Sequence, residues 1–204
     1  MAFRTQDWSN WEEDWWGISI SVPDDTRRDR YRLIRKLSFY RFAALHPGFW
    51  IRPYHKSEDL ENRLQELMNS AYCKSIRFRF YSKREMEKIP RLWKVAETHK
   101  RFRECIQYIT KSREDYNLND PQDALRGMMI LGDIAVKQLA SDPMLPDVFL
   151  PTGWQGRHLR DIFIEWTRLT YEKSKSYWKK IYQSNEQLAH VNPESYERYY
   201  KLAP

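Results

Sequence analysis

The sequence predicts an α+β protein in which a small mixed domain precedes an all-helical one. Before residue 82, apolar residues alternate with polar residues over four short stretches, which is the period of half-buried strands. After residue 90 the apolar residues recur at helical spacing instead. Two helical stretches separate the strands in the order βαββαβ, so we expect a ferredoxin-like domain followed by a helical C-terminal domain.

The ferredoxin-like domain is predicted over residues 15–84, after a polar N-terminal lead of residues 1–14. The lead contains Trp8 and Trp11 and is either disordered or a strap packed on the domain. The first helix is expected to follow a turn at residues 24–26 (Asp-Asp-Thr), which supplies cap residues. The predicted strands are residues 15–22, 42–45, 49–54 and 75–81, and the second helix covers residues 60–71.

The helical C-terminal domain is predicted over residues 90–183, and residues 184–204 form a polar tail. Prolines and helix caps mark the boundaries inside this domain. The expected elements are a helix over residues 92–113, a helix from Pro121 to about Ala140, an extended segment with three prolines, and a long helix that starts near Gln155.

A ferredoxin-like order places both helices on one face of the sheet, against the apolar strand residues. The opposite face is then expected to carry arginine and aromatic side chains, a composition typical of a platform for single-stranded nucleic acid. Alternatively, another subunit or the C-terminal helices cover this face. The residues assigned to it are Ser19, Ser21, Trp50, Arg52, Tyr54, Arg77, Arg79 and Tyr81.

The first helix is strongly basic, in a chain with a formal net charge of +7. Such a helix can follow a phosphate backbone, or it can be a solvated face paired with Asp24, Asp25 and Asp29. The residues predicted to bind nucleic acid are Arg27, Arg28, Arg30, Arg35, Arg52, Arg77 and Arg79. The residues predicted to contact a ligand or a partner are Trp50, Tyr54, Tyr81 and Trp154.

The sequence contains no motif that requires catalysis. It has no glycine-rich phosphate loop, no HExxH, no CxxC and no GxSxG, and its five histidines are isolated. Cys73 and Cys105 are expected to be buried, as fits a reducing cytoplasm. No stretch of about 18 apolar residues is present. We therefore expect a cytoplasmic, non-enzymatic protein with no cofactor, no bound metal and no membrane partner.

Two segments resemble the PaaX family of bacterial transcriptional repressors. Residues 47–53 (PGFWIRP) follow the basic helix, and residues 142–156 (DPMLPDVFLPTGWQG) are similar to the DP-x-LP…LP-x-x-W-x-G segment of that family's C-terminal domain. The resemblance extends over residues 11–182. It implies a dimeric repressor that is released by an aryl-CoA thioester and that normally carries an N-terminal winged helix-turn-helix.

This chain begins where the family's middle domain begins. We therefore expect a PaaX-like transcription regulator without its own helix-turn-helix, acting as a homodimer on DNA or RNA or beside a separate DNA-binding protein. An alternative is an effector-sensing or protein-binding module. Its pocket would lie between the sheet and the C-terminal helices, and an acyl-CoA would be held by Trp50, Arg52, Arg77 and Arg79.

The middle domain is also similar to the small ferredoxin-like protein of the CRISPR spacer-acquisition complex. In that group a metal-binding Asp stands near the end of the first strand, ahead of a DD-x-RR turn. Residues 24–28 fit the turn, but Ser21 stands at the Asp position, and a hydroxyl is a poor ligand for Mg²⁺. This similarity therefore implies a nucleic-acid-binding protein whose nuclease site is lost.

Overall fold

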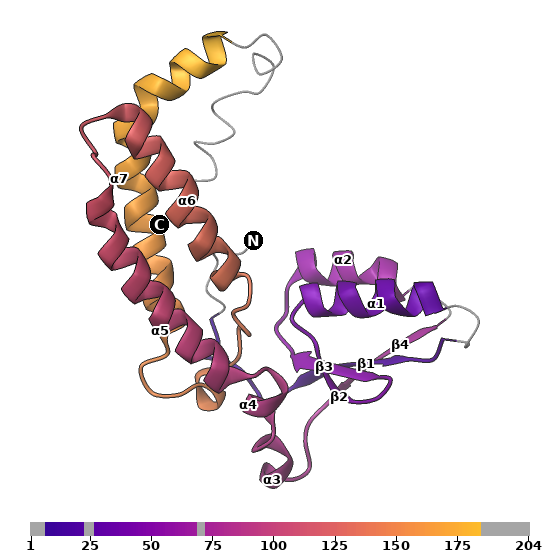
Figure 1. The fold of residues 1–204 in the computed structure, drawn as a ribbon. Helices are drawn as coiled ribbons and strands as arrows, with labels where there is room; N and C mark the ends of the chain where they lie inside the picture. Colours follow the sequence, from indigo (N-terminus) through magenta and orange to yellow (C-terminus); the bar gives the residue numbers. More distant parts are fainter. Residues whose placement is uncertain (1–6, 23–26, 69–71, 185–204) are drawn as a thin grey trace. The chain divides into compact units, whose positions relative to one another are not determined.

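The computed structural model describes residues 7–22, 27–68 and 72–184 (Figure 1). The turn at residues 24–26 and the tail after residue 184 lie outside this part. The elements are β1 (Trp15–Ile20), α1 (Arg27–Phe39), β2 (Ala43–His46), β3 (Phe49–Pro53), α2 (Glu58–Met68), β4 (Cys73–Phe78), α3 (Lys83–Met86), α4 (Ile89–Leu92), α5 (Val95–Ser112), α6 (Pro121–Leu139) and α7 (Gln155–Ser184), with 3-10 turns at Arg113–Asp115 and Asp147–Phe149.

The chain divides into two compact units. The sheet unit contains the described residues up to Ala96 together with Pro143–Thr152, and the helical unit contains Glu97–Asp142 and the described chain from Gly153 onward. No helix in the described ranges combines the length and apolar character needed to cross a membrane.

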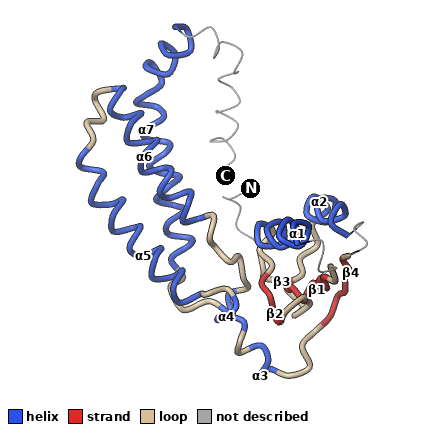
Figure 2. Tube along the Cα trace, turned by 45° about the vertical axis from the view of Figure 1, so that its right-hand side comes forward, coloured by secondary structure: helices blue, strands red, loops and turns tan. Residues whose placement is uncertain are grey.

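The sheet unit has four antiparallel strands in the order β2-β3-β1-β4, and α1 and α2 lie side by side over one face (Figures 1 and 2). This arrangement confirms the predicted α+β, ferredoxin-like class. Trp16 and Ile18 of β1 pack against Leu33 and Leu37 of α1 and Leu64 of α2, all of them buried. The apolar stripes of the helices and the alternation in β1 therefore meet in one core.

The predicted assignment of side chains to the two faces of the sheet is wrong for four residues. Directly paired residues of neighbouring strands point to the same face. Arg52 and Arg77 pair with Trp16, and Trp50 pairs with Ile18, so these three residues lie on the face that the helices cover. Tyr54 also packs against the core under the helices. Residue polarity alone could not reveal this, because pairing register decides the face.

The other face of the sheet is partly covered by an aromatic cluster. Trp15 is fully buried there, with ring contacts to Phe80, Trp93 and Phe149. Phe149 comes from Pro143–Thr152, which returns to the sheet unit after two helices of the helical unit. The predicted extended segment is thus a packed part of the sheet unit.

Beyond this cluster, on the same face of the sheet, the Phe49 side chain lies close to the backbone of β1. A Cβ atom at Gly17 would lie 2.5 Å from Cζ of Phe49, so glycine lets the Phe49 ring lie flat on β1. Ile76 of β4 remains 49% exposed.

The helical unit is a packed group of α5, α6 and α7 around residues such as Phe102, Leu131 and Leu159. As predicted, Pro121 begins α6, and the Asp120 side chain caps it by accepting from the Gln122 N–H at 3.0 Å. The helix expected over residues 92–113 is confirmed as α5 over Val95–Ser112, but its predicted start is three residues too early. The chain breaks after α4, where Lys94 has a φ of +50°, and α5 then begins at Val95.

Candidate functional site

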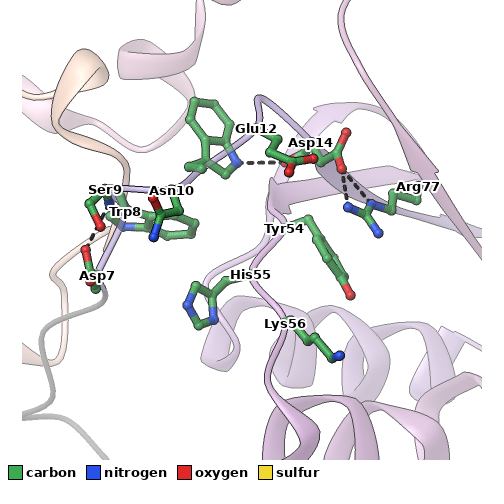
Figure 3. A pocket seen from close by; sticks show the side chains of 11 residues that line it. Asp7, Trp8, Ser9, Asn10, Glu12, Asp14, Tyr54, His55, Lys56 and Arg77 are labelled. Atoms are coloured by element: carbon green, nitrogen blue, oxygen red, sulfur yellow. Dashed lines mark hydrogen bonds and ion pairs between the residues drawn. The ribbon is translucent and has the colours of Figure 1, made fainter.

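A pocket of about 290 Å³ lies beside residues 7–14, which we call the strap, within the sheet unit (Figure 3). The strap forms one side of it, the segment after β3 forms another, and β4 contributes an arginine. The lining residues are Asp7, Trp8, Ser9, Asn10, Trp11, Glu12, Asp14, Tyr54, His55, Lys56 and Arg77.

The strap is held to the sheet unit by backbone and ring contacts. The carbonyl of Asp14 accepts from the Tyr54 N–H at 2.8 Å and from the Trp11 indole N–H at 2.9 Å. The Trp8 ring meets the His55 ring edge to face, with centroids 5.8 Å apart. The described part of the predicted N-terminal lead, residues 7–14, is therefore packed on the sheet unit.

The Asp14 carboxylate joins the strap to the end of β4. Both Arg77 and Arg79 donate to it, and Arg79 also reaches Glu12 at 3.3 Å (Figure 3 shows the Arg77 contact). Asp14 is only 8% exposed. The hydrogen bond from Arg79, followed by that from Arg77, holds the pKa of this carboxyl below its ordinary value, although burial opposes the shift.

Arg77 and Arg79 are consequently engaged within the protein, although about half of each side chain is exposed. The Arg77 guanidinium also lies 4.0 Å from the centre of the Tyr54 ring, a cation–π contact. The Tyr54 hydroxyl donates to Glu61 at 3.1 Å, and burial and then this carboxylate raise the pKa of Tyr54. These arginines therefore hold the strap, and their predicted contact with nucleic acid stays a prediction.

Arg52 has a structural position. It is 7% exposed, donates from Nη1 to the Tyr40 carbonyl at 2.8 Å, and lies over the Phe42 ring. Burial, and then the charge of Arg41, lower the pKa of Arg52 to about 10. A guanidinium enclosed in this way cannot reach a phosphate, so we do not propose Arg52 as a nucleic-acid contact.

The basic residues of α1 form an exposed cationic surface. Arg27 begins the helix, but its side chain lies outside the described part. No described acidic residue, Asp29 included, forms an ion pair with the exposed basic residues of α1. These exposed residues are Arg28, Arg30, Arg32, Arg35 and Lys36.

The remaining predicted contacts belong to two different units. Tyr81, after β4, is fully exposed. Trp50 is partly buried against the core of the sheet unit. Trp154 belongs to the helical unit, where its ring stacks on His99 with centroids 5.6 Å apart and meets Phe102 edge to face.

The segment around Trp154 builds the start of α7. A side chain at Gly156 would collide with the carboxylate of Asp142 and would lie 2.5 Å from the Trp154 indole nitrogen. Asp142, Trp154 and Gly156 are therefore packed against one another, and these residues of the 142–156 segment have a structural role.

Sequence reasoning missed the pocket residues His55 and Lys56 and two exposed rings of α1, Tyr31 and Phe39. The two rings could have been found from spacing, because positions 31, 35 and 39 share one helical face. The pocket could not, because its walls come from three separate segments of the chain, residues 7–14, residues 54–56 and Arg77, which only the fold brings together.

Comparisons with known proteins support the domain order. The family model described as the PaaX protein central Cas2-like domain matches residues 8–89, and that of the PaaX-like protein C-terminal domain matches residues 91–180. A comparison with curated proteins gave no significant match. Among solved structures, the uncharacterized protein Rv0674 from Mycobacterium tuberculosis has a similar fold, with a TM-score of 0.60 and 20% identity. The match covers 81% of this chain and 64% of that chain.

Proposed function

Because the chain belongs to the PaaX family, we propose that it is a non-catalytic regulatory protein that binds nucleic acid through the basic face of α1. One observation carries this proposal. The exposed arginines of α1 have no acidic partner among the described residues, so their charge is available to phosphates. Phosphate contacts of this kind supply most of the sequence-independent affinity of nucleic-acid-binding proteins.

The test is a binding titration with labelled duplex and single-stranded DNA over a range of salt concentrations. For a triple variant, Arg28→Ala, Arg32→Ala and Arg35→Ala, which removes three exposed arginines from one side of α1, we expect at least tenfold weaker binding. The slope of log affinity against log salt should fall by about 2 to 3, since each lost phosphate contact removes about one unit.

A matched control removes the same charge from the helical unit by Arg103→Ala, Arg168→Ala and Lys179→Ala, which are also exposed. If both triple variants lose affinity equally, net charge and not α1 binds the ligand. Absence of binding by the unaltered protein at low salt would refute the proposal. Sedimentation equilibrium on the same samples tests the accompanying proposal of a homodimer, which membership of the PaaX family suggests.

A second candidate function is the sensing of a small aromatic effector at the strap pocket. Trp8, Trp11 and Tyr54 offer rings, and Lys56 and Arg77 offer positive charge. A volume of about 290 Å³ is near the lower limit of ligand pockets. It therefore suits an aromatic acyl group better than a whole CoA thioester.

Thermal unfolding with an aryl-CoA thioester, with free CoA and with the free aromatic acid tests this candidate. Binding to the folded state should raise the melting temperature by mass action. The rise should disappear in Trp8→Ala and Lys56→Ala. A rise with CoA alone that both variants keep would place the ligand elsewhere.

A further inference from the structure

One solvent-facing stripe of α1 combines positive charge with large rings. At 3.6 residues per turn, its members lie within one side of the helix, opposite the buried Leu33 and Leu37. Asp29, the acidic residue of α1, does not belong to this side of the helix. The members of the stripe are Arg28, Tyr31, Arg32, Arg35 and Phe39.

The two rings of the stripe are open to solvent. Tyr31 is 73% exposed and Phe39 is 72% exposed. Within the described part of the chain, the Phe39 ring meets that of Tyr40 edge to face, with centroids 5.3 Å apart. With a rise of 1.5 Å per residue, their Cα atoms are roughly 12 Å apart along the helix axis. Arg35 lies between them, so an aromatic ring, a positive charge and a second aromatic ring follow one another along the helix.

We propose that this stripe binds single-stranded nucleic acid, with unpaired bases stacked on Tyr31 and Phe39 and phosphates held by the arginines. This inference rests on the nucleic-acid binding proposed for α1 and adds the state of the strand. A duplex hides the faces of its bases, so the rings would have nothing to stack on. A single strand presents both bases and phosphates, and an alternation of rings and cations matches it.

The experiment compares four labelled probes of equal length by fluorescence anisotropy: oligo(dT), oligo(U), a duplex, and an abasic strand with the same phosphates. We expect both single strands to bind about tenfold more tightly than the duplex. Tyr31→Ala with Phe39→Ala should weaken strand binding at least tenfold, because a base on an aromatic ring contributes roughly five- to hundredfold in affinity.

The salt slope separates the rings from the arginines. The ring variant should keep the slope of the unaltered protein, whereas Arg28→Ala with Arg35→Ala should lower it by about 1.4, since each phosphate contact with a single strand contributes about 0.7. On the abasic strand the ring variant and the unaltered protein should bind equally. Tyr31→Phe keeps a ring and should retain affinity, and Tyr81→Ala removes an exposed ring outside α1 and should change nothing.

Three outcomes would overturn the inference. If the duplex binds as tightly as the strands and the ring variant binds normally, α1 binds nucleic acid by charge alone, and the proposed function survives. If no probe binds, both proposals fail. If only anionic phospholipid vesicles bind, the stripe is a membrane-facing surface. Circular dichroism of each variant checks that α1 is still folded.

Discussion

Asp14 shows how one carboxylate can decide the role of two arginines. Arg77 and Arg79 belong to an alternating, basic strand end that the sequence presents as a cationic surface. Asp14 stands 63 and 65 residues earlier, yet the pairing of β1 with β4 brings it between their guanidinium groups. The charge at this end of the sheet is therefore largely balanced, whereas the exposed basic residues of α1 have no acidic partner among the described residues.

This contact predicts a pH-dependent stability. The pKa of Asp14 is lowered in the folded state, so its contribution is present above the ordinary carboxyl pKa of about 3.9 and is lost as the pH falls through the lower folded value. Asp14→Asn should cost about 1–2 kcal/mol in the free energy of unfolding at pH 7. The difference from the unaltered protein should shrink below about pH 4.

Denaturant unfolding at pH 7 and near pH 3 measures this difference. Glu12→Gln is the control, because Glu12 is exposed and reaches only Arg79, so it should change the stability by less than about 0.5 kcal/mol. An equal loss at both pH values for Asp14→Asn would mean that packing, not ionisation, explains the effect.

Among the elements, those with local signals were predictable. The apolar periodicity predicted β1 and the inner face of α1. A cap residue and Pro121 marked the start of α6, and the end of a proline-rich segment marked the start of α7. Features that depend on contacts between residues far apart in the chain could not be predicted. The faces of β3 and β4 depend on register, and the break at Lys94 has neither glycine nor proline to mark it.

The candidate site divides in the same way. The basic residues of α1 were identified from a charge run, and the structure leaves those with described side chains open to solvent. Arg52 was assigned from composition and is buried, because it pairs opposite Trp16. The strap pocket depends on chain segments meeting across the sheet, which no local pattern encodes.

For the whole molecule, the order of residues along the chain differs from their grouping into units. Pro143–Thr152 is flanked by helices of the helical unit, yet its Phe149 packs on Trp11 and Trp15 of the sheet unit, with centroids 5.6 Å away in each case. The sheet unit is therefore built from two separate pieces of chain.

This grouping predicts where a mutation will act. Phe149→Ala should destabilise the sheet unit by about 3–5 kcal/mol, because it leaves a cavity against the rings of Trp11 and the buried Trp15. Hydrogen exchange followed by mass spectrometry should show faster exchange in Trp15–Ile20. Val148→Ala is the control, since Val148 is 74% exposed. Faster exchange confined to α5, α6 and α7 would contradict the assignment of Phe149 to the sheet unit.

The two-piece construction also bears on how the protein is made. During synthesis on the ribosome, residues up to 96 emerge first, and they include Trp11, Phe80 and Trp93, which contact the Trp15 ring. The remaining ring contact, from Phe149, is not translated until after α5 and α6, so an early nascent chain would leave one side of the Trp15 indole uncovered. Nascent chains arrested before and after this point should differ in their resistance to protease, with resistance rising once Pro143–Thr152 has left the exit tunnel.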